Sequence, residues 1–426
     1  MIHKAGKICF IIFILLVIPL SSCRPSKTKL FPEITFPDEY VEVQDFNPTA
    51  YSWCGTPNVA AVTEDGIYFK AGIFLYFADK TTLKARPLCY KLTCAHSSAS
   101  EEQVGKCNAF CPTPIGKDFV GVFRDKVYYS GFDTETGRYE LYSADLDGSN
   151  RKVFIADISS IVMNSMRIHR GVMYYPEGMI DLDGKVRYTF RAMDLTKANP
   201  ESEILFDGST VTGSFSRVLP YGNYIYYNEV FLLDREDGTK MRRTRYSRFH
   251  ILDRTNEVLT ELTDLELYGI VNDKLVFYDG SDYYEMDPET KDLVLSELGI
   301  EKFQQSHPYW QCHAGSITER ITFFSCYDYE NEPKDGEVIW KRIIVNEAGE
   351  EVCSIDEPNF NLPENSCQVV SINGKDYYLH FWASIRPFAV ELYSIEDLLN
   401  GKLKSHRLLY AMDLNDLSPG FRYTVK

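Results

Sequence analysis

The residues best suited to metal binding or covalent chemistry lie in a cysteine-rich stretch near the start of the chain. Four cysteines and one histidine follow the pattern Cys-x4-Cys-x-His-x10-Cys-x3-Cys, and they are Cys89, Cys94, His96, Cys107 and Cys111. Thiolates and imidazole are the ligands that Zn²⁺ takes in tetrahedral structural sites. In an exported protein the same cysteines can instead form one or two disulfides that staple the loop. Because a Cys-x2-Cys pair is missing, disulfides are the favoured interpretation. The spacing still allows a metal site, and free thiols are a third alternative.

Other cysteines cluster later in the chain. Eleven cysteines are present, and the nine that follow Cys23 are an odd number, so at least one lies outside any disulfide within the chain. We expect four of them to cross-link neighbouring strands around the sixth repeat described below: Cys312, Cys326, Cys353 and Cys367.

Two further stretches carry candidate ligand-binding side chains. His307, Trp310 and His313 gather in a segment that the pattern assigns to a loop between repeats. Such a loop can line a ligand-binding funnel. Trp382 follows an aromatic stretch, and its ring can stack on a sugar face. Packing of these rings against the protein itself is the simpler interpretation, and the sequence favours it.

Motifs for catalysis are absent from the sequence. It has no Gly-x-Ser-x-Gly elbow, no His-Glu-x-x-His pair and no glycine-rich phosphate or dinucleotide loop. We therefore assign no catalytic residue. A glycan-active enzyme that uses two carboxylates stays open as an alternative, because residue spacing says nothing about carboxylate separation in space.

A repeated aromatic triplet organises most of the chain. Its third residues stand 60, 46, 52, 51, 46 and 54 positions apart. The seven copies are Ile67-Tyr68-Phe69, Val127-Tyr128-Tyr129, Met173-Tyr174-Tyr175, Ile225-Tyr226-Tyr227, Val276-Phe277-Tyr278, Thr322-Phe323-Phe324 and Asp376-Tyr377-Tyr378. Asp, Asn and Gly commonly precede the triplet, as tight hairpin turns require. After each copy comes an alternating apolar strand that ends in an acid or Asn, then a turn and another apolar strand.

Seven units of four strands, each near 50 residues, predict an all-β fold of the β-propeller class. We expect seven four-stranded blades, with six or eight as alternatives. The predicted domains are a signal peptide over residues 1–22, a lipidated tether over 23–39, and one propeller over 40–426 with an insert at 88–112. A terminal strand, either Tyr40 to Phe46 or Phe421 to Val425, is expected to close the ring.

The repeat resembles a known group of propellers. Tyr128-Tyr129 and the segment Leu141 to Ser149 are similar to the TolB-like and YWTD-like families. Two tripeptides resemble the Cys-x-His…Cys-x-Ala segment of uncharacterised propeller lipoproteins, and they are Cys94-Ala95-His96 and Cys107-Asn108-Ala109. This resemblance implies binding of a protein or another ligand, and it brings no catalytic residues.

The N-terminus predicts export and a lipid anchor. A basic start precedes the apolar run Ile8 to Leu20, which is too short to cross a bilayer, and the run leads into Leu20-Ser21-Ser22-Cys23. This order resembles a bacterial lipoprotein signal, in which cleavage before Cys23 leaves a cysteine that carries acyl chains such as palmitate. An ordinary secretory signal is the alternative. We expect the mature protein on the extracytoplasmic face of a bacterial cell membrane.

The charge balance narrows the choice of partner. The chain has 61 acidic and 45 basic residues; removal of Lys4 and Lys7 with the leader leaves 61 against 43, a net charge of −18. Such a surface repels phosphate backbones, so a nucleic-acid partner is not expected. The leading hypothesis is a lipid-anchored propeller that binds a partner protein or an extracellular ligand such as a glycan. A metal-dependent sensor built on the Cys89 to Cys111 insert is a further alternative.

Overall fold

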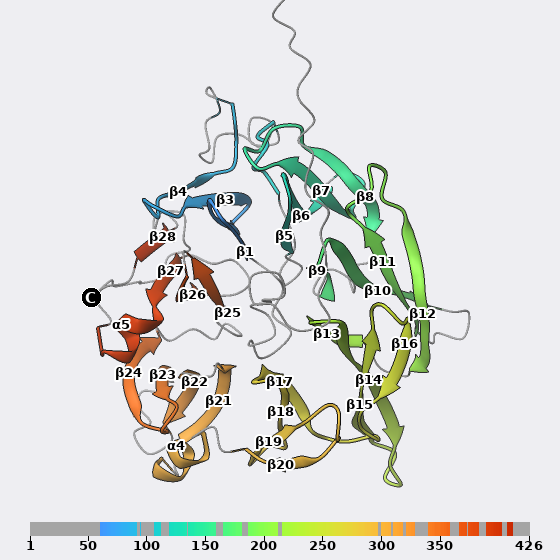
Figure 1. Ribbon diagram of the computed structural model, residues 1–426, viewed down its shortest axis with the longest axis vertical. Coiled ribbons are helices and arrows are strands. Elements are labelled where there is room, and N and C mark those ends of the chain that lie inside the picture. Colours follow the sequence, from blue (N-terminus) through green and yellow to red (C-terminus); the bar gives the residue numbers. More distant parts are fainter. Residues whose placement is uncertain are drawn as a thin grey trace, which may run out of the picture. The chain divides into compact units, whose positions relative to one another are not determined.

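Seven four-stranded antiparallel sheets form the blades of a β-propeller (Figure 1). The computed structural model describes residues 60–91, 94, 106–111, 119–133, 135–158, 165–180, 186–211, 215–296, 300–307, 310–317, 321–328, 340–357, 366–372, 374–382, 389–402 and 407–411. The chain divides into two units, Met1–Pro37 and Asp38–Lys426, and all the described residues belong to the second. The predicted all-β propeller with seven blades is confirmed.

Each blade takes its strands in chain order from one continuous part of the sequence. Blade 1 consists of β1 (Ala60–Thr63), β2 (Gly66–Ala71), β3 (Phe74–Asp79) and β4 (Ala85–Pro87), and blade 2 of β5 (Val120–Phe123), β6 (Lys126–Asp133), β7 (Arg138–Asp145) and β8 (Lys152–Ile158). Blade 3 consists of β9 (Arg167–His169), β10 (Val172–Ile180), β11 (Val186–Asp194) and β12 (Ser202–Val211), and blade 4 of β13 (Phe215–Tyr221), β14 (Tyr224–Asp234), β15 (Lys240–His250) and β16 (Thr255–Val258).

Blades 5 to 7 continue the same order. Blade 5 consists of β17 (Glu266–Val271), β18 (Lys274–Tyr278), β19 (Tyr283–Met286) and β20 (Leu293–Leu295). Blade 6 consists of β21 (Trp310–Ile317), β22 (Ile321–Asp328), β23 (Trp340–Asn346) and β24 (Glu351–Glu357), and blade 7 of β25 (Ser366–Ile372), β26 (Lys375–Trp382), β27 (Ala389–Ser394) and β28 (Arg407–Ala411). Among the described residues, two short helices interrupt the pattern, α4 (Ile300–Ser306) before blade 6 and α5 (Ile395–Leu399) between β27 and β28. In the described part of the chain, no helix is long and apolar enough to cross a membrane.

The aromatic triplets occupy the second strand of each blade. Neighbouring residues on a strand point to opposite faces of the sheet. Tyr68 therefore packs in a core shared with blade 2, around Val120 and Tyr129. Phe69 packs in the core on the other face, which is shared with blade 7. Each blade thus buries both faces against its two neighbours, as the repeat predicted.

Tight turns join the inner strands as the sequence indicates. Asn272 and Asp273 connect β17 to β18, and both have positive φ, 51° and 62°. Val271 pairs directly with Lys274 across this two-residue loop. Positive φ at both central positions defines the type I′ turn that fits the right-handed twist of a hairpin.

The ring closes between blade 7 and blade 1. The first strand of each blade lies nearest the centre of the ring (Figure 1). Among these first strands, β1 lies beside both β5 and β25. The core at this seam combines Phe69 of blade 1 with Leu379 and Phe381 of blade 7. Within the described residues, both end blades complete their four strands from their own continuous segments. The two terminal strands predicted to close the ring lie outside these residues.

We predict that the seam between blades 7 and 1 is essential for stability. Phe381→Ala removes a buried ring that contacts Phe69 edge-on at 6.5 Å between ring centroids. The lost burial and the cavity should lower the free energy of unfolding by about 3–5 kcal/mol, measured by urea denaturation. Leu408→Ala on β28 of the same blade is the control, because Leu408 is 47 % exposed; this variant should stay within about 0.5 kcal/mol of the wild type. Equal effects of the two variants would contradict closure by this core.

Candidate functional site

Three cysteines of the insert come together in space. The Sγ atoms of Cys89, Cys94 and Cys107 all lie within 4.8 Å of one another. Cys107 is buried, with 1 % of its surface exposed, and the other two are half-buried. All three are thiols in this structure. The cluster therefore has the ligand type and the proximity of a metal centre.

Backbone hydrogen bonds to blade 1 hold the two halves of the insert. The first half continues from β4, where the Leu88 N–H donates to the Leu75 carbonyl at 2.8 Å. The second half, Lys106–Cys111, lies against the start of β3. There the Leu75 N–H donates to the Ala109 carbonyl at 2.8 Å, and the Cys111 N–H donates to the Ile73 carbonyl at 2.9 Å. Residues 18 positions apart in sequence, Cys89 and Cys107, are thereby brought side by side.

The second half of the insert also contacts blade 2. Asn108 donates from Nδ2 to the Gly148 carbonyl at 2.7 Å and accepts at its own carbonyl from the Tyr129 hydroxyl at 3.2 Å. Arg151 donates to the Cys107 carbonyl at 3.3 Å, and its guanidinium lies 4.1 Å from the centroid of the Tyr142 ring. The cysteine cluster therefore sits on a segment that joins blades 1 and 2.

Burial controls the ionisation of the cluster. Burial, together with the neighbouring sulfurs of Cys94 and Cys89, raises the pKa of the Cys107 thiol to about 12. The backbone amide of Ala109 acts in the opposite direction and lowers this pKa. Three thiolates cannot share this small space without a cation, because like charges in a poorly solvated site repel each other strongly.

The other two predicted residues of the insert do not belong to this group. Cys111 is a buried thiol in the blade 1–blade 2 core, among Tyr68, Val120 and Tyr129. His96 lies outside the described residues. Of the five residues that the sequence suggested for one disulfide or metal site, the structure brings three together.

The predicted ligand-binding residues of blades 6 and 7 are distributed over several elements. His307 follows α4; its Nδ1 lies 2.9 Å from the Ser306 hydroxyl and 3.0 Å from the Phe303 carbonyl. Trp310 and His313 lie in β21, the first strand of blade 6, where a loop was expected. Trp382 ends β26 of blade 7. The interpretation of residues 307–313 as one loop is therefore wrong for its second half.

The later cysteines show mixed chemistry. Cys326 on β22 is disulfide-bonded, and its cross-strand neighbour in register is Cys312 on β21. Cys353 on β24 is a buried thiol, and burial raises its pKa to about 11. Its sulfur lies 3.7 Å from the Leu398 carbonyl of α5.

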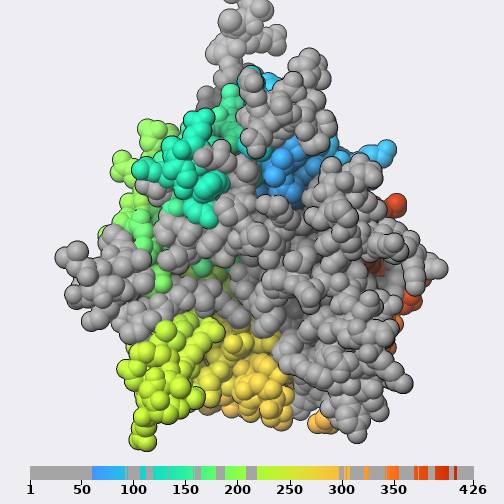
Figure 2. Space-filling view, turned by 180° about the vertical axis from the view of Figure 1, so that it is seen from behind, coloured from blue at the N-terminus to red at the C-terminus, as the bar shows by residue number. Residues whose placement is uncertain are grey.

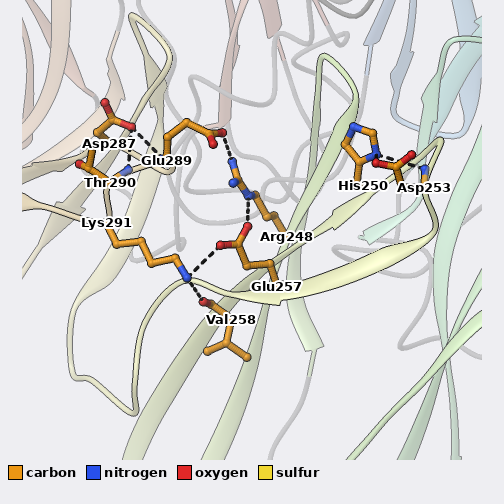
Figure 3. A network of polar contacts seen from close by, with 9 residues as sticks. All are labelled: Arg248, His250, Asp253, Glu257, Val258, Asp287, Glu289, Thr290 and Lys291. Atoms are coloured by element: carbon orange, nitrogen blue, oxygen red, sulfur yellow. Dashed lines mark hydrogen bonds and ion pairs between the residues drawn. The ribbon is translucent and has the colours of Figure 1, made fainter.

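Sequence reasoning missed a charged network between blades 4 and 5 (Figure 3). Arg248 on β15 is 4 % exposed; it donates from Nε to Glu257 at 2.8 Å and from Nη1 to Glu289 at 2.5 Å. Lys291 joins the network through Glu257 at 2.9 Å and the Val258 carbonyl at 2.9 Å. Glu289 and Lys291 follow β19 of blade 5, so the buried guanidinium links two blades. No local sequence pattern marks this network, because Glu289 lies 41 residues from Arg248 in the chain.

The comparisons with known proteins give no family for this chain. No family model matches the chain, and no curated protein matches it. Among solved structures, the tricorn protease is 10 % identical with a TM-score of 0.44 over 88 % of this chain and 35 % of that chain. The chain thus spans about a third of that protein. The β-propeller domain of the trilobed protease from Pyrococcus furiosus is 11 % identical with a TM-score of 0.44, covering 86 % of this chain and 98 % of that one.

A third solved structure is TolB from Acinetobacter baumannii. It is 14 % identical with a TM-score of 0.33, and the match covers 79 % of this chain and 78 % of that chain. The class to which this chain belongs, a β-propeller of seven four-stranded blades, follows from its own sheets.

The network of Figure 3 predicts an acid-sensitive contribution to stability. Lys291, and next to it Arg248, hold the pKa of Glu257 below its ordinary value of 4.5, against the effect of partial burial. A carboxylate with a lowered pKa stabilises the fold above the unfolded value, and this contribution is lost as the pH falls through the folded value. Glu257→Gln should therefore destabilise the protein at pH 7 by at most about 1 kcal/mol, because the group is largely solvated.

Urea unfolding at several pH values measures this effect. The difference between wild type and Glu257→Gln should shrink as the pH falls below 4.5 and then vanish. Glu261→Gln is the control, since Glu261 is an exposed acid of the same region. A difference that is independent of pH would show that the charge of Glu257 is not what stabilises this seam.

Proposed function

We propose that this chain is a lipid-anchored, extracytoplasmic propeller whose rim binds a partner protein. The lipid anchor is supported by the basic start, the apolar run and the Leu20-Ser21-Ser22-Cys23 sequence. The partner-binding role is supported by one feature of the described surface, the outer strand of blade 5. The two supports are independent, and each has its own test below.

The outer strand β20 is the observation that carries the binding proposal. Its residues Leu293, Val294 and Leu295 are 43 %, 53 % and 52 % exposed. A strand with one buried face shows alternation of buried and exposed residues. Here three consecutive apolar side chains are open to water, at the edge of a sheet where, within the part of the chain that the structure describes, β20 pairs only with β19. Apolar edge strands expose unpaired backbone groups and invite another strand.

The neighbouring surface enlarges this apolar edge. Val258, at the end of β16, is 46 % exposed, and Lys291 at the β19–β20 turn bonds to its carbonyl. Blades 4 and 5 present a continuous surface along one edge of the view in Figure 2. The other outer strand at this seam, β16, has the polar sequence Thr-Asn-Glu-Val. The occupant that fits β20 is an extended segment of a partner protein, held by main-chain hydrogen bonds and apolar contacts.

The buried carboxylates of the described residues support a scaffold more than a carboxylate-based enzyme. They are Glu229 on β14 and Glu391 on β27. Glu229 accepts from Arg245 at 2.9 Å and 2.6 Å, and Glu391 accepts from the Tyr393 hydroxyl at 2.6 Å. Each is engaged within its own blade, and hydrogen-bonded groups of this kind stabilise strands.

The first prediction from this proposal concerns the anchor. Cys23→Ser should abolish incorporation of a fatty-acid label and release the protein from the membrane fraction, because the thiol that carries the acyl chain is gone. Cys9→Ser is the matched control, since Cys9 lies within the apolar run and should leave labelling unchanged. The measurement is metabolic labelling with an alkyne fatty acid in a bacterial host. An unlabelled wild-type protein would contradict the lipid anchor.

The second prediction concerns the edge strand. A photoreactive amino acid in place of Val294 should give a discrete adduct with one protein on irradiation of cells. The same residue in place of Thr255 on β16, which is also exposed, should not. Adding Leu295→Lys should reduce the Val294 adduct at least about tenfold, because a charge on an edge strand opposes strand addition. The melting temperature of the Leu295→Lys variant should match that of the wild type, since Leu295 is exposed.

Three outcomes would overturn the edge-strand proposal. They are the absence of an adduct from position 294, an equal adduct from position 255, and an adduct that Leu295→Lys leaves unchanged. An adduct with twice the mass of the chain would show pairing between two copies, which also contradicts a separate partner protein. None of these results depends on lipidation, so the two parts of the proposal fail separately.

A further inference from the structure

We propose that Cys89, Cys94 and Cys107 bind one Zn²⁺ ion, which fixes the insert on the junction of blades 1 and 2. This site is distinct from the edge strand of blade 5, and it does not depend on partner binding. It would make the insert a structural metal centre on the propeller.

The spacing of the three sulfurs is close to that of a tetrahedral centre. Zinc–sulfur bonds of about 2.3 Å at tetrahedral angles place the sulfur atoms about 3.8 Å apart. The three Sγ atoms lie within 4.8 Å of one another, so small side-chain rotations bring them to zinc distance. A tetrahedral ion takes one further donor, and the assignment of the three thiols does not depend on which group supplies it.

Three sulfurs in one place are better matched by a metal than by a disulfide. A disulfide would use two of them and leave a third thiol in contact with the bridge. A metal ion uses all three, and soft thiolates select Zn²⁺ over hard cations such as Mg²⁺ and Ca²⁺. An iron–sulfur cluster takes four cysteines as a rule, and the fourth nearby cysteine, Cys111, packs in the apolar core instead.

The surroundings of Cys107 suit a thiolate that is held by a metal. The backbone amide of Ala109, two residues further along the chain, favours the thiolate form of Cys107. Such N–H donors stabilise the negative sulfur, and they are part of the outer shell that orients metal ligands. Binding of Zn²⁺ displaces the thiol protons, and the cation then offsets the repulsion among the three thiolates.

The metal would act on the stability of the junction. The Cys107 carbonyl accepts from Arg151 of blade 2, and the adjacent Asn108 bonds to Gly148. A zinc ion on the Cys107 sulfur therefore connects these contacts to Cys89, which follows β4 of blade 1. Because the metal ligands come from both halves of the insert, the ion would close the loop between them.

Metal analysis of the full-length chain, purified in detergent with a reductant, tests the assignment. The wild type should carry about one zinc ion per chain, as a closed structural site does. Cys89→Ser, Cys94→Ser and Cys107→Ser should each lower the zinc content at least about tenfold, because loss of a thiolate ligand weakens a structural site severely. Cys111→Ser, in the same insert, and Cys353→Ser, a buried thiol of blade 6, are controls that should keep the ion.

A second measurement keeps the test valid if a variant fails to fold. Zinc is removed from the wild type with a chelator, and Co²⁺ is added. Thiolate charge-transfer absorption should appear. Co²⁺ or Zn²⁺ should also slow the alkylation of the half-buried Cys89 and Cys94 under denaturant-free conditions, whereas the reactivity of the buried Cys353 should not depend on the metal. Peptide mapping identifies the protected residues.

The proposal is overturned by any of three results. The first is a wild-type protein without zinc whose Co²⁺ complex lacks thiolate absorption. The second is a disulfide between any two of the three cysteines in protein isolated without oxygen. The third is loss of zinc in Cys111→Ser equal to the loss in Cys107→Ser, which would assign the ion to a different set of ligands.

Discussion

The structure depends on one constraint, which is that every blade must have both of its faces covered. Adjacent residues of the second strand point in opposite directions, and in this chain both are large and apolar, as Tyr68 and Phe69 illustrate. Burial of each such side chain contributes about 1.5–3 kcal/mol relative to its exposure. A single four-stranded sheet would leave half of these rings in water. A row of blades would still leave two open faces, and only the closed ring leaves none.

Polar groups complete the seams between neighbouring blades. Buried Lys70 of blade 1 donates to the Ser130 carbonyl of blade 2 at 3.1 Å, and His169 of blade 3 lies 2.7 Å from the Gly222 carbonyl of blade 4. Arg248 performs the same role between blades 4 and 5. A buried charge destabilises a protein unless it is paired and hydrogen-bonded. The two carboxylates of Glu257 and Glu289 meet this requirement, so the network of Figure 3 is a structural link between blades.

The repeat could be predicted from sequence because it is a local signal that recurs. The triplets mark the second strands, and the Asn272-Asp273 turn follows from residues that tolerate positive φ. The segment from Trp310 was mistaken for a loop although Trp-Gln-Cys-His alternates apolar with polar residues, because the repeated triplet marks only the second strand of each blade and not the first. Pairing with β22 decided its structure instead, and that partner is visible only in three dimensions. The Arg248 network was missed for the same reason, since Glu289 lies 41 residues away in the chain.

The burial of blade faces, which stabilises the rest of the ring, contributes little to the insert. Its own core consists of three buried residues, Phe74, Cys107 and Ala109, and one of them belongs to β3. So little burial cannot offset the conformational entropy of ordering a loop of this length. Hydrogen bonds to Gly148 and Arg151 hold its second half, and the Leu88 N–H bond to the Leu75 carbonyl holds the start of its first half. Lys91 also donates to the Lys106 carbonyl, so a side-chain hydrogen bond joins the two halves. A cross-link would strengthen this connection, and small folds that lack a core obtain one from a disulfide or a metal. With three sulfurs gathered at one point, a metal uses all of them, and the local sequence needs only cysteines in both halves of the insert to make the cross-link.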